Sequence, residues 1–184
     1  MRVAEAKKSV INEFLKAWVS ANISLEKVDK FRPFLMTHCR GGGTIPAADT
    51  LRCKYLPNIF EEHIQALHNE FQGKPVAIIV DETTDSRARS VVNTLFSYHN
   101  STKLISVDYL QVVNNTTIRQ LVVQILTEWS IPFPAPRLLL SDSAAYMKKC
   151  YRDVLHPLMP QLQHNACPAH ILNLIRLVFT QCNY

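Results

Sequence analysis

The chain has 184 residues, of which 47% are apolar, and a formal net charge of +5. Such a chain can bury a hydrophobic core in one domain or in a domain with a helical appendage, which excludes disordered proteins. The longest apolar runs, Val76–Val80 and Leu138–Leu140, are far below the roughly 20 residues of a membrane-spanning helix, so membrane proteins are excluded too.

Cysteine and glycine usage narrows the class further. The five cysteines are widely spaced and form no CxxC pair, which favours reduced thiols inside the cell over a disulfide framework. The first residues are charged where a signal peptide needs an apolar region. Only four glycines occur, and no glycine-rich phosphate loop can be assembled from them, so nucleotide-cofactor folds are excluded. The mild basic excess favours anionic partners.

The first 38 residues carry a helical pattern. Apolar residues recur at helical spacing from Val10 to Trp18, and Ser24 with Glu26 indicates a second helix start. Pro33 is expected to interrupt this second helix, and the Gly41–Gly43 tract to end the unit.

Two more helices are expected before the first strand. Residues 46–56 predict a short helix that Pro57 breaks, and residues 59–71 predict the next one. The Gly73–Pro75 segment then separates a helical region from a strand-rich one. We therefore expect a helical N-terminal segment at 1–74 and a second domain at 75–184.

Three strands open the second domain. Val76–Val80 is a short run of β-branched and aliphatic residues, typical of a central strand buried on both faces. Ser90–Tyr98 and Leu104–Val113 are β-branched and aromatic runs joined by the polar turn at 99–103. Together they predict an antiparallel meander.

Helices and strands alternate after the meander. The expected elements are a helix at 118–129 capped by Asn115 or Thr116, a strand at 137–140, a helix at 144–155, a strand at 163–167 and a helix at 168–181. This chain order is that of the ribonuclease H-like fold, so we predict an α/β protein with a mixed sheet and flanking helices.

Three carboxylates, Asp81, Glu82 and Asp85, follow the predicted central strand directly. A carboxylate close to apolar walls is unfavourable unless it is hydrogen-bonded, protonated or paired with a cation. Two interpretations are open. Either these residues include a metal-binding acid at a strand end, or they mark a polar strand-to-turn transition in which Asp81 caps the turn.

Asp142 follows the fourth predicted strand, which lies beside the first in this topology. The carboxylates of Asp81 and Asp142 are then expected to converge and to share Mg²⁺ with phosphate oxygens. The alternative for Asp142 is to cap the helix that starts at Ala144.

Two further groups of residues are candidates. His164, Cys167 and His170 have a zinc-like spacing that needs Cys150 or Cys182 as a fourth ligand; otherwise Cys167 is a small buried residue. Basic side chains on one helix face are either a solvated surface or a contact with the DNA backbone, and these are Lys148, Lys149 and Arg152.

Three motifs, in this order, resemble the hAT superfamily of DNA transposases: VDETTDS at 80–86, LLSDSAAYM at 139–147 and CPAHILNLI at 167–175. The resemblance implies that Asp81 and Asp142 are catalytic and bind Mg²⁺ or Mn²⁺. It also marks Asp85, Cys167 and His170 as motif residues.

A second resemblance covers residues 9–67, which are similar to the segment after the zinc finger in the CGG triplet-repeat-binding protein family. That family is nuclear, regulates transcription and derives from a hAT transposase. This sequence has no zinc-finger spacing before residue 9, and it ends before the third acid, a Glu, that the transposases carry.

The two resemblances together imply a nuclear, hAT-derived protein that binds double-stranded DNA weakly, with no membrane partner. We expect a truncated ribonuclease H-like core whose ancestral cation site is empty and which does not cut DNA alone. The alternatives are a domesticated, non-catalytic regulator of transcription by RNA polymerase II and a degenerate reading frame. The sequence does not predict the oligomeric state.

Overall fold

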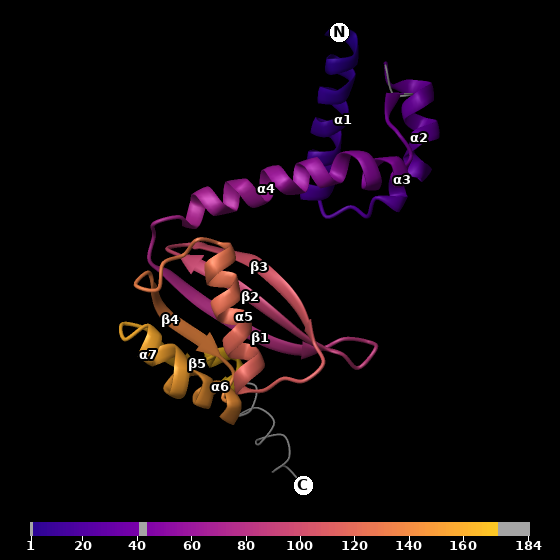
Figure 1. Ribbon diagram of the computed structural model, residues 1–184. Coiled ribbons are helices and arrows are strands. Elements are labelled where there is room, and N and C mark those ends of the chain that lie inside the picture. The colour runs from indigo at the N-terminus through magenta and orange to yellow at the C-terminus, as the bar shows by residue number, and fades with distance from the viewer. Residues whose placement is uncertain (1, 41–43, 173–184) are drawn as a thin grey trace. The chain divides into compact units, whose positions relative to one another are not determined.

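The computed structural model describes residues 2–40 and 44–172. The chain divides into two compact units, Met1–Leu67 and His68–Tyr184. The first is helical, and the second contains a mixed five-stranded sheet with flanking helices (Figure 1). The predicted fold class is confirmed. Within the described residues, none of the helices combines the length and apolarity that crossing a membrane would need.

The helical unit is built around one apolar cluster. Its elements are α1 (Arg2–Ser20), α2 (Glu26–His38), α3 (Ala48–Thr50), the π-turn η2 (Leu51–Tyr55) and α4 (Leu56–Phe71), whose last four residues belong to the second unit. The buried members of the cluster are Ile11, Leu15, Val28, Ile45 and Leu51. α1 contributes the buried Ile11 and Leu15, one helical turn apart, and α2 contributes the buried Val28 and the partly buried Leu35. Each helix is therefore held by packing of its apolar face.

Two prolines do not interrupt helices as the sequence predicted. Pro33 lies inside α2, which continues to His38, because Val28 and Leu35 on either side pack against the core. Pro57 lies in the first turn of α4. There the N–H of Leu56 donates to the carbonyl of Leu51, so a wider π-turn precedes the proline ring and relieves its clash with the preceding turn.

The sheet of the second unit has the strand order β3-β2-β1-β4-β5. The strands are β1 (Val76–Thr84), β2 (Ser90–Tyr98), β3 (Ser101–Leu110), β4 (Pro136–Ser141) and β5 (Gln163–Ala166). β1 pairs with β2 antiparallel and with β4 parallel, and β5 extends the sheet parallel to β4. The predicted central strand, meander and mixed sheet are confirmed, and the order is that of a ribonuclease H-like fold.

The boundaries of β1 and β3 differ most from the predictions, while β4 is one residue longer at each end and β5 one residue shorter. β1 continues four residues past Val80, because its pairing with β2 extends to Thr84. The second turn is two residues long, with His99 at φ 50°, so β3 starts at Ser101 and ends at Leu110. A short turn with positive φ matches the twist of an antiparallel hairpin, which explains the earlier start.

One face of the sheet is covered by α5 (Asn115–Glu128), which lies across the strands in Figure 1. Val76, Ile78 and Val80 alternate as buried residues along β1. α5 supplies a matching stripe of buried side chains, which are Ile118, Leu121, Val122, Ile125 and Leu126. The buried residues of β1, which alternate along the strand, and those of α5, which recur at helical spacing, therefore form one core.

Asn114, and neither Asn115 nor Thr116, caps α5. The side chain of Asn114 accepts hydrogen bonds from the backbone N–H groups of Thr116 and Thr117 at 2.8 and 3.0 Å. The hydroxyl oxygen of Thr117 in turn accepts a hydrogen bond from the N–H of Asn114, which completes a capping box. The predicted cap was one or two residues too late because three polar residues in a row fit the position equally well.

The chain after β4 forms α6 (Ala145–Cys150), the π-turn η3 (Tyr151–Leu155) and α7 (His156–Leu158). This helical stretch ends three residues later than predicted, since a π-turn again accommodates a proline, Pro157, in the turn that follows. Residues 168–172 are helical, as predicted. The rest of the last predicted helix lies outside the described residues, as does the Gly41–Gly43 tract.

The hairpin between β1 and β2 is held by Asp85. Its Oδ1 accepts hydrogen bonds from the backbone N–H groups of Arg87 and Arg89 at 2.8 and 2.9 Å. The Arg89 guanidinium donates to Oδ2 at 2.8 Å. These bonds lower the pKa of Asp85 below its ordinary value, and the backbone hydrogen bond from Arg89 has the largest effect.

We predict that Asn114→Ala lowers the free energy of unfolding of the second unit by about 1 kcal/mol, because two backbone donors lose their acceptor. Asn115→Ala, next to the cap but outside it, is the matched control and should change little. Denaturant unfolding followed by Trp129 fluorescence, in a shared Trp18→Phe background, measures both. Equal effects of the two substitutions would contradict the assigned cap.

A second prediction concerns acid stability. The folded-state pKa of Asp85 is below 3.8, so its contribution is complete above that pH and is lost as the pH falls through the folded value. Asp85→Asn should lower the melting temperature most near neutral pH and less at about pH 3. Ser86→Ala, in the same turn, is the control. A pH-independent effect of Asp85→Asn would show that its charge does not hold the hairpin.

Candidate functional site

The first predicted acid, Asp81, does not end its strand. β1 continues to Thr84, and Asp81 lies opposite Asn93 of β2. The parallel pairing with β4 ends earlier, at Ile79 and Leu140. Asp81 therefore lies on a part of β1 that is paired on one side only, which corrects the predicted strand end and the turn-capping alternative.

Asp81 and Asp142 each follow a paired residue of neighbouring parallel strands by two positions, since Ile79 pairs with Leu140. Asp81 is exposed, and its side chain takes part in no hydrogen bond or ion pair among the described residues. Asp142 is half-buried directly after β4. The adjacency of the two strands is as predicted, and the convergence of the two carboxylates on one cation stays a prediction.

Glu82 points to the opposite face from Asp81, as successive residues of a strand do. The hydroxyl of Tyr146, on α6, donates a hydrogen bond to Glu82 Oε2 at 2.5 Å. Burial raises the pKa of Tyr146, and the bond to Glu82 and the charges of Asp142 and Glu82 raise it further. Tyr146 thus stays protonated and links the β1 acid to the element that follows Asp142.

A histidine and a serine lie beside this group. Ser141 is buried at the end of β4, and its hydroxyl is 2.8 Å from Nε2 of His164 on β5. Burial lowers the pKa of His164, and the positive charge of Lys148 lowers it further, against an opposing effect of Asp142. The imidazole is therefore uncharged at neutral pH, as expected for a ring that packs near Tyr151 at 5.2 Å.

Asp142 organises the turn before α6 without being its cap. Asp142 Oδ1 accepts a hydrogen bond from the N–H of Ala144 at 3.2 Å. The N-cap of α6 is Ala144, and no side chain bonds to the first turn. The carboxylate therefore keeps acceptor capacity for another partner, since a carboxylate offers about four lone-pair sites.

The donor set decides which cation these residues fit. Asp81 is free to bind, Asp142 has one bond to the backbone, and Glu82 is already bonded to Tyr146. Within residues 2–40 and 44–172, no group of three or more His, Cys, Asp or Glu side chains is arranged to hold a metal ion. Asp81 and Asp142 are carboxylates of the kind that Mg²⁺ or Mn²⁺ prefers, and the binding of such an ion by the two together stays a prediction.

The zinc-like spacing is not gathered into one site among the described residues. His164 bonds to Ser141, and His170 is exposed. Burial raises the pKa of Cys150 to about 11, which disfavours the thiolate that zinc requires. Cys167 is half-buried, and its N–H donates to the carbonyl of Ser141. The other candidate fourth ligand, Cys182, lies outside the described residues.

The three predicted basic residues differ in their surroundings. Lys148 and Lys149 are exposed on α6. Arg152 is exposed on η3, but its guanidinium pairs with Asp153 at 2.7 Å, and this bond raises the pKa of Arg152 and lowers that of Asp153. Of the three charges, those of the two lysines are therefore the more available to a phosphate.

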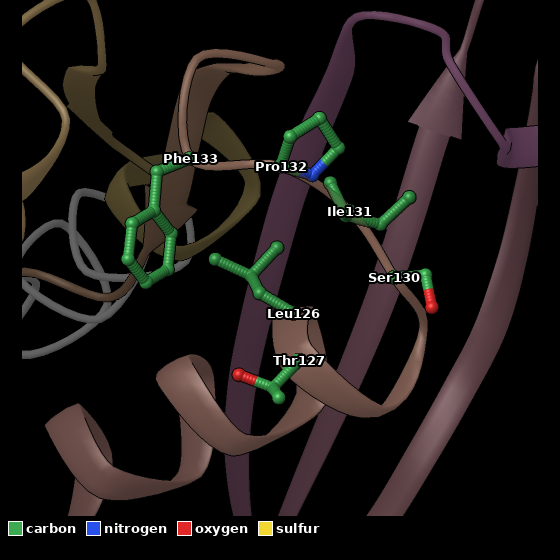
Figure 2. Close-up of a pocket in the computed structure, with 6 residues that line it drawn as sticks. All are labelled: Leu126, Thr127, Ser130, Ile131, Pro132 and Phe133. Atoms are coloured by element: carbon green, nitrogen blue, oxygen red, sulfur yellow. The ribbon is translucent and has the colours of Figure 1, made fainter.

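Figure 2 shows an apolar pocket whose lining residues come from the end of α5 and the loop after it. It follows the carboxyl end of α5, before β4 begins, whereas Asp142 follows the last residue of β4. The pocket has a volume of about 340 Å³ and contains no charged side chain; its lining is Leu126, Thr127, Ser130, Ile131, Pro132 and Phe133. It has no charged side chain that could pair with a phosphate or a cation.

Sequence reasoning missed the partner of Glu82. Tyr146 lies on α6 and comes 64 residues after Glu82, so no local spacing in the sequence links the two. Ser141 gave no signal either, because a serine at a strand end most often belongs to a turn.

The helical unit has recognisable relatives. The family described as "CGGBP1 helical domain" matches residues 2–58. Two proteins named CGG triplet repeat-binding protein 1, from Homo sapiens and Mus musculus, are each 46% identical over 66 residues, which is 35% of this chain. The chain spans 40% of the length of these curated relatives.

Two solved structures are similar to part of the chain. A chain of the simian T-cell lymphotropic virus intasome in complex with PP2A regulatory subunit B56 gamma has a TM-score of 0.38 and 9% identity, covering 56% of this chain and 37% of that chain. A chain of the Mos1 strand transfer complex has a TM-score of 0.34 and 13% identity, covering 59% and 40%. Because both TM-scores are low, no function follows from them. The sequence similarity therefore lies in the helical unit, which resembles the helical domain of CGG triplet repeat-binding protein 1.

Proposed function

We propose that this chain is a DNA-binding protein of the nucleus, in which a helical unit related to CGG triplet-repeat-binding proteins is joined to a ribonuclease H-like unit inherited from a hAT transposase. The observation that carries the proposal is the 46% identity over 66 residues to two proteins named for binding CGG triplet repeats, together with the match of residues 2–58 to the CGGBP1 helical domain. The net charge of +5 agrees with an anionic partner.

The ribonuclease H-like unit contributes the two aspartates. Asp81 and Asp142 are the residues that would hold Mg²⁺ or Mn²⁺ together with DNA phosphate oxygens. When bound, such an ion activates water and stabilises a leaving phosphate oxygen. In this proposal Asp81 binds from the one-sided part of β1, while Asp142 is held in place by its bond to the N–H of Ala144.

Strand cleavage by this chain alone is not expected. A third carboxylate that fixes the ion is not gathered at Asp81 and Asp142 among the described residues. Glu82 is nearest in sequence, but it faces away from Asp81 and accepts the Tyr146 hydroxyl. Misplacement of a catalytic group by about 1 Å can already lower a rate a hundredfold. We therefore propose binding of DNA without cleavage.

A second function shares the same DNA contact. A domesticated regulator of transcription by RNA polymerase II needs binding but no metal chemistry. The hydrogen bond from Tyr146 to Glu82 favours the non-catalytic regulator, because a carboxylate that accepts a hydrogen bond within the protein is less available to bind an ion. Both functions predict the same binding and differ only in whether Asp81 and Asp142 matter to it.

The expected binding is salt-sensitive and depends partly on α6. Lys148→Gln/Lys149→Gln should reduce the slope of log affinity against log salt by about 1.8 on duplex DNA, since each phosphate contact contributes about 0.9. Arg87→Gln/Arg137→Gln removes the same charge from exposed positions on other elements and is the control. Fluorescence anisotropy with a labelled CGG-repeat duplex and a shuffled duplex of equal composition measures both. Absence of duplex binding by the unmodified chain would reject the proposed function.

The cleavage prediction has its own test. The purified chain, incubated with Mg²⁺ or Mn²⁺ on nicked and hairpin DNA, should give no product on a denaturing gel. Cleavage that disappears in both Asp81→Ala and Asp142→Ala, while Asp153→Ala retains it, would show that the two aspartates are catalytic after all. Cleavage that survives both substitutions would come from a contaminant and would leave the prediction standing.

A further inference from the structure

One face of α2 combines aromatic rings and basic groups in an arrangement that the core does not use. Its residues follow one another at helical spacings of three and four, and they are Lys27, Lys30, Phe31, Phe34 and His38. All five are exposed, with Phe31 at 51% and Phe34 at 58%. We call this face the α2 stripe. The buried side of the same helix is occupied by Val28.

The rings of the stripe are held in place by neighbours. Phe31 meets the Trp18 ring of α1 edge to face, with centroids 5.4 Å apart. Trp18 in turn donates its indole N–H to the carbonyl of Ser24 at 3.2 Å and packs against Phe14. Phe34 packs against the ring of His38 at 5.0 Å. Rings fixed in this way lose little further freedom when a flat partner stacks on them.

The charges of the stripe are all positive or neutral, because the two acids of α2 have partners elsewhere. Glu26 pairs with Arg52 at 3.0 Å and accepts the Ser24 hydroxyl. Asp29 accepts the N–H of Ala48 at 3.1 Å. Lys27 and Lys30 form no ion pair among the described residues. An anionic partner is therefore favoured on this face.

We propose that the α2 stripe binds single-stranded DNA, with unpaired bases stacked on Phe31 and Phe34 and phosphates at Lys27 and Lys30. This proposal rests on the DNA-binding function proposed above and names a contact surface and a DNA form for the helical unit. Stacking on aromatic rings needs bases whose flat faces are free, and a duplex keeps those faces inside. Lysines beside the rings supply the contact with the backbone.

The alternative occupant, an apolar helix of a protein, fits the same face less well. Covering Phe31 and Phe34 with such a helix would also cover Lys27 and Lys30, and a charged group that loses water without gaining a partner is strongly unfavourable. Single-stranded DNA satisfies both the rings and the ammonium groups. The aromatic rings alone would fit either an apolar helix or single-stranded DNA, and the positive charges beside them favour single-stranded DNA.

The test uses the full chain and three labelled probes of one mixed sequence: single-stranded DNA, the same DNA as a duplex, and single-stranded RNA. Fluorescence anisotropy should show single-stranded DNA bound most tightly. Phe34→Leu, which keeps an apolar side chain but removes the stacking face, should weaken the binding of single-stranded DNA about 5- to 150-fold, the range for one stacked base. Phe60→Leu, an equally exposed ring on α4, is the matched control and should change little.

The charged residues are tested separately. Lys27→Gln/Lys30→Gln should lower the salt slope for single-stranded DNA by about 1.4, at about 0.7 per phosphate, while Phe34→Leu should leave the slope unchanged. Lys7→Gln/Lys8→Gln, on exposed positions of α1, is the control. Circular dichroism of each variant verifies that the helices are retained.

Three outcomes overturn the proposal. They are equal effects of the stripe and control variants, tighter binding of the duplex, and tighter binding of RNA. In each, duplex binding by the unmodified chain would leave the proposed function standing while this inference fails. If the unmodified chain binds no probe at all, both fail together.

Discussion

The second unit depends on β1, which pairs with β2 and β4 in opposite directions. Its buried residues, Val76, Ile78 and Val80, are covered on one face by α5, so the strand is both the centre of the sheet and part of the core. Burying three such side chains contributes on the order of 1.5–3 kcal/mol each. Because β1 extends past β4, this core strand also carries Asp81 and Glu82 to the edge where Asp142 begins its turn.

Alternation along β1 separates its two acids. Asp81 and Glu82 are consecutive in the chain and so lie on opposite faces of the sheet. Glu82 is drawn into a hydrogen bond with Tyr146, whereas Asp81 stays exposed without a partner among the described residues. The same strand therefore supplies one acid that supports the fold and one that is available for binding. The helical unit has a comparable division, since α2 turns its acids toward internal partners and its lysines outward.

The sequence predicted the sheet well because its signals were local and repeated. The run Val76–Val80, the β-branched runs after it and the apolar stripe of α5 each have the period of their element, and their chain order is enough to place β1 at the centre. Boundaries failed where the deciding contact is not local. β1 continues because β2 pairs with it as far as Thr84, and Pro57 is tolerated because a π-turn precedes it. The site was predicted in part: the adjacency of the strands before Asp81 and Asp142 followed from topology, while the Glu82–Tyr146 bond depends on where α6 lies.

The π-turns before Pro57 and Pro157 change the rotation of the helix that follows each of them. Each places one additional residue in a helical turn, and every residue rotates a helix by about 100°. Deleting one residue from Leu51–Tyr55 would restore regular α geometry, but it would also turn the apolar face of α4 by that angle relative to the residues before it. In both places the wider turn makes room for a proline ring that would clash with the preceding turn of a regular α-helix. The direction of the α4 apolar face therefore depends on the π-turn before it.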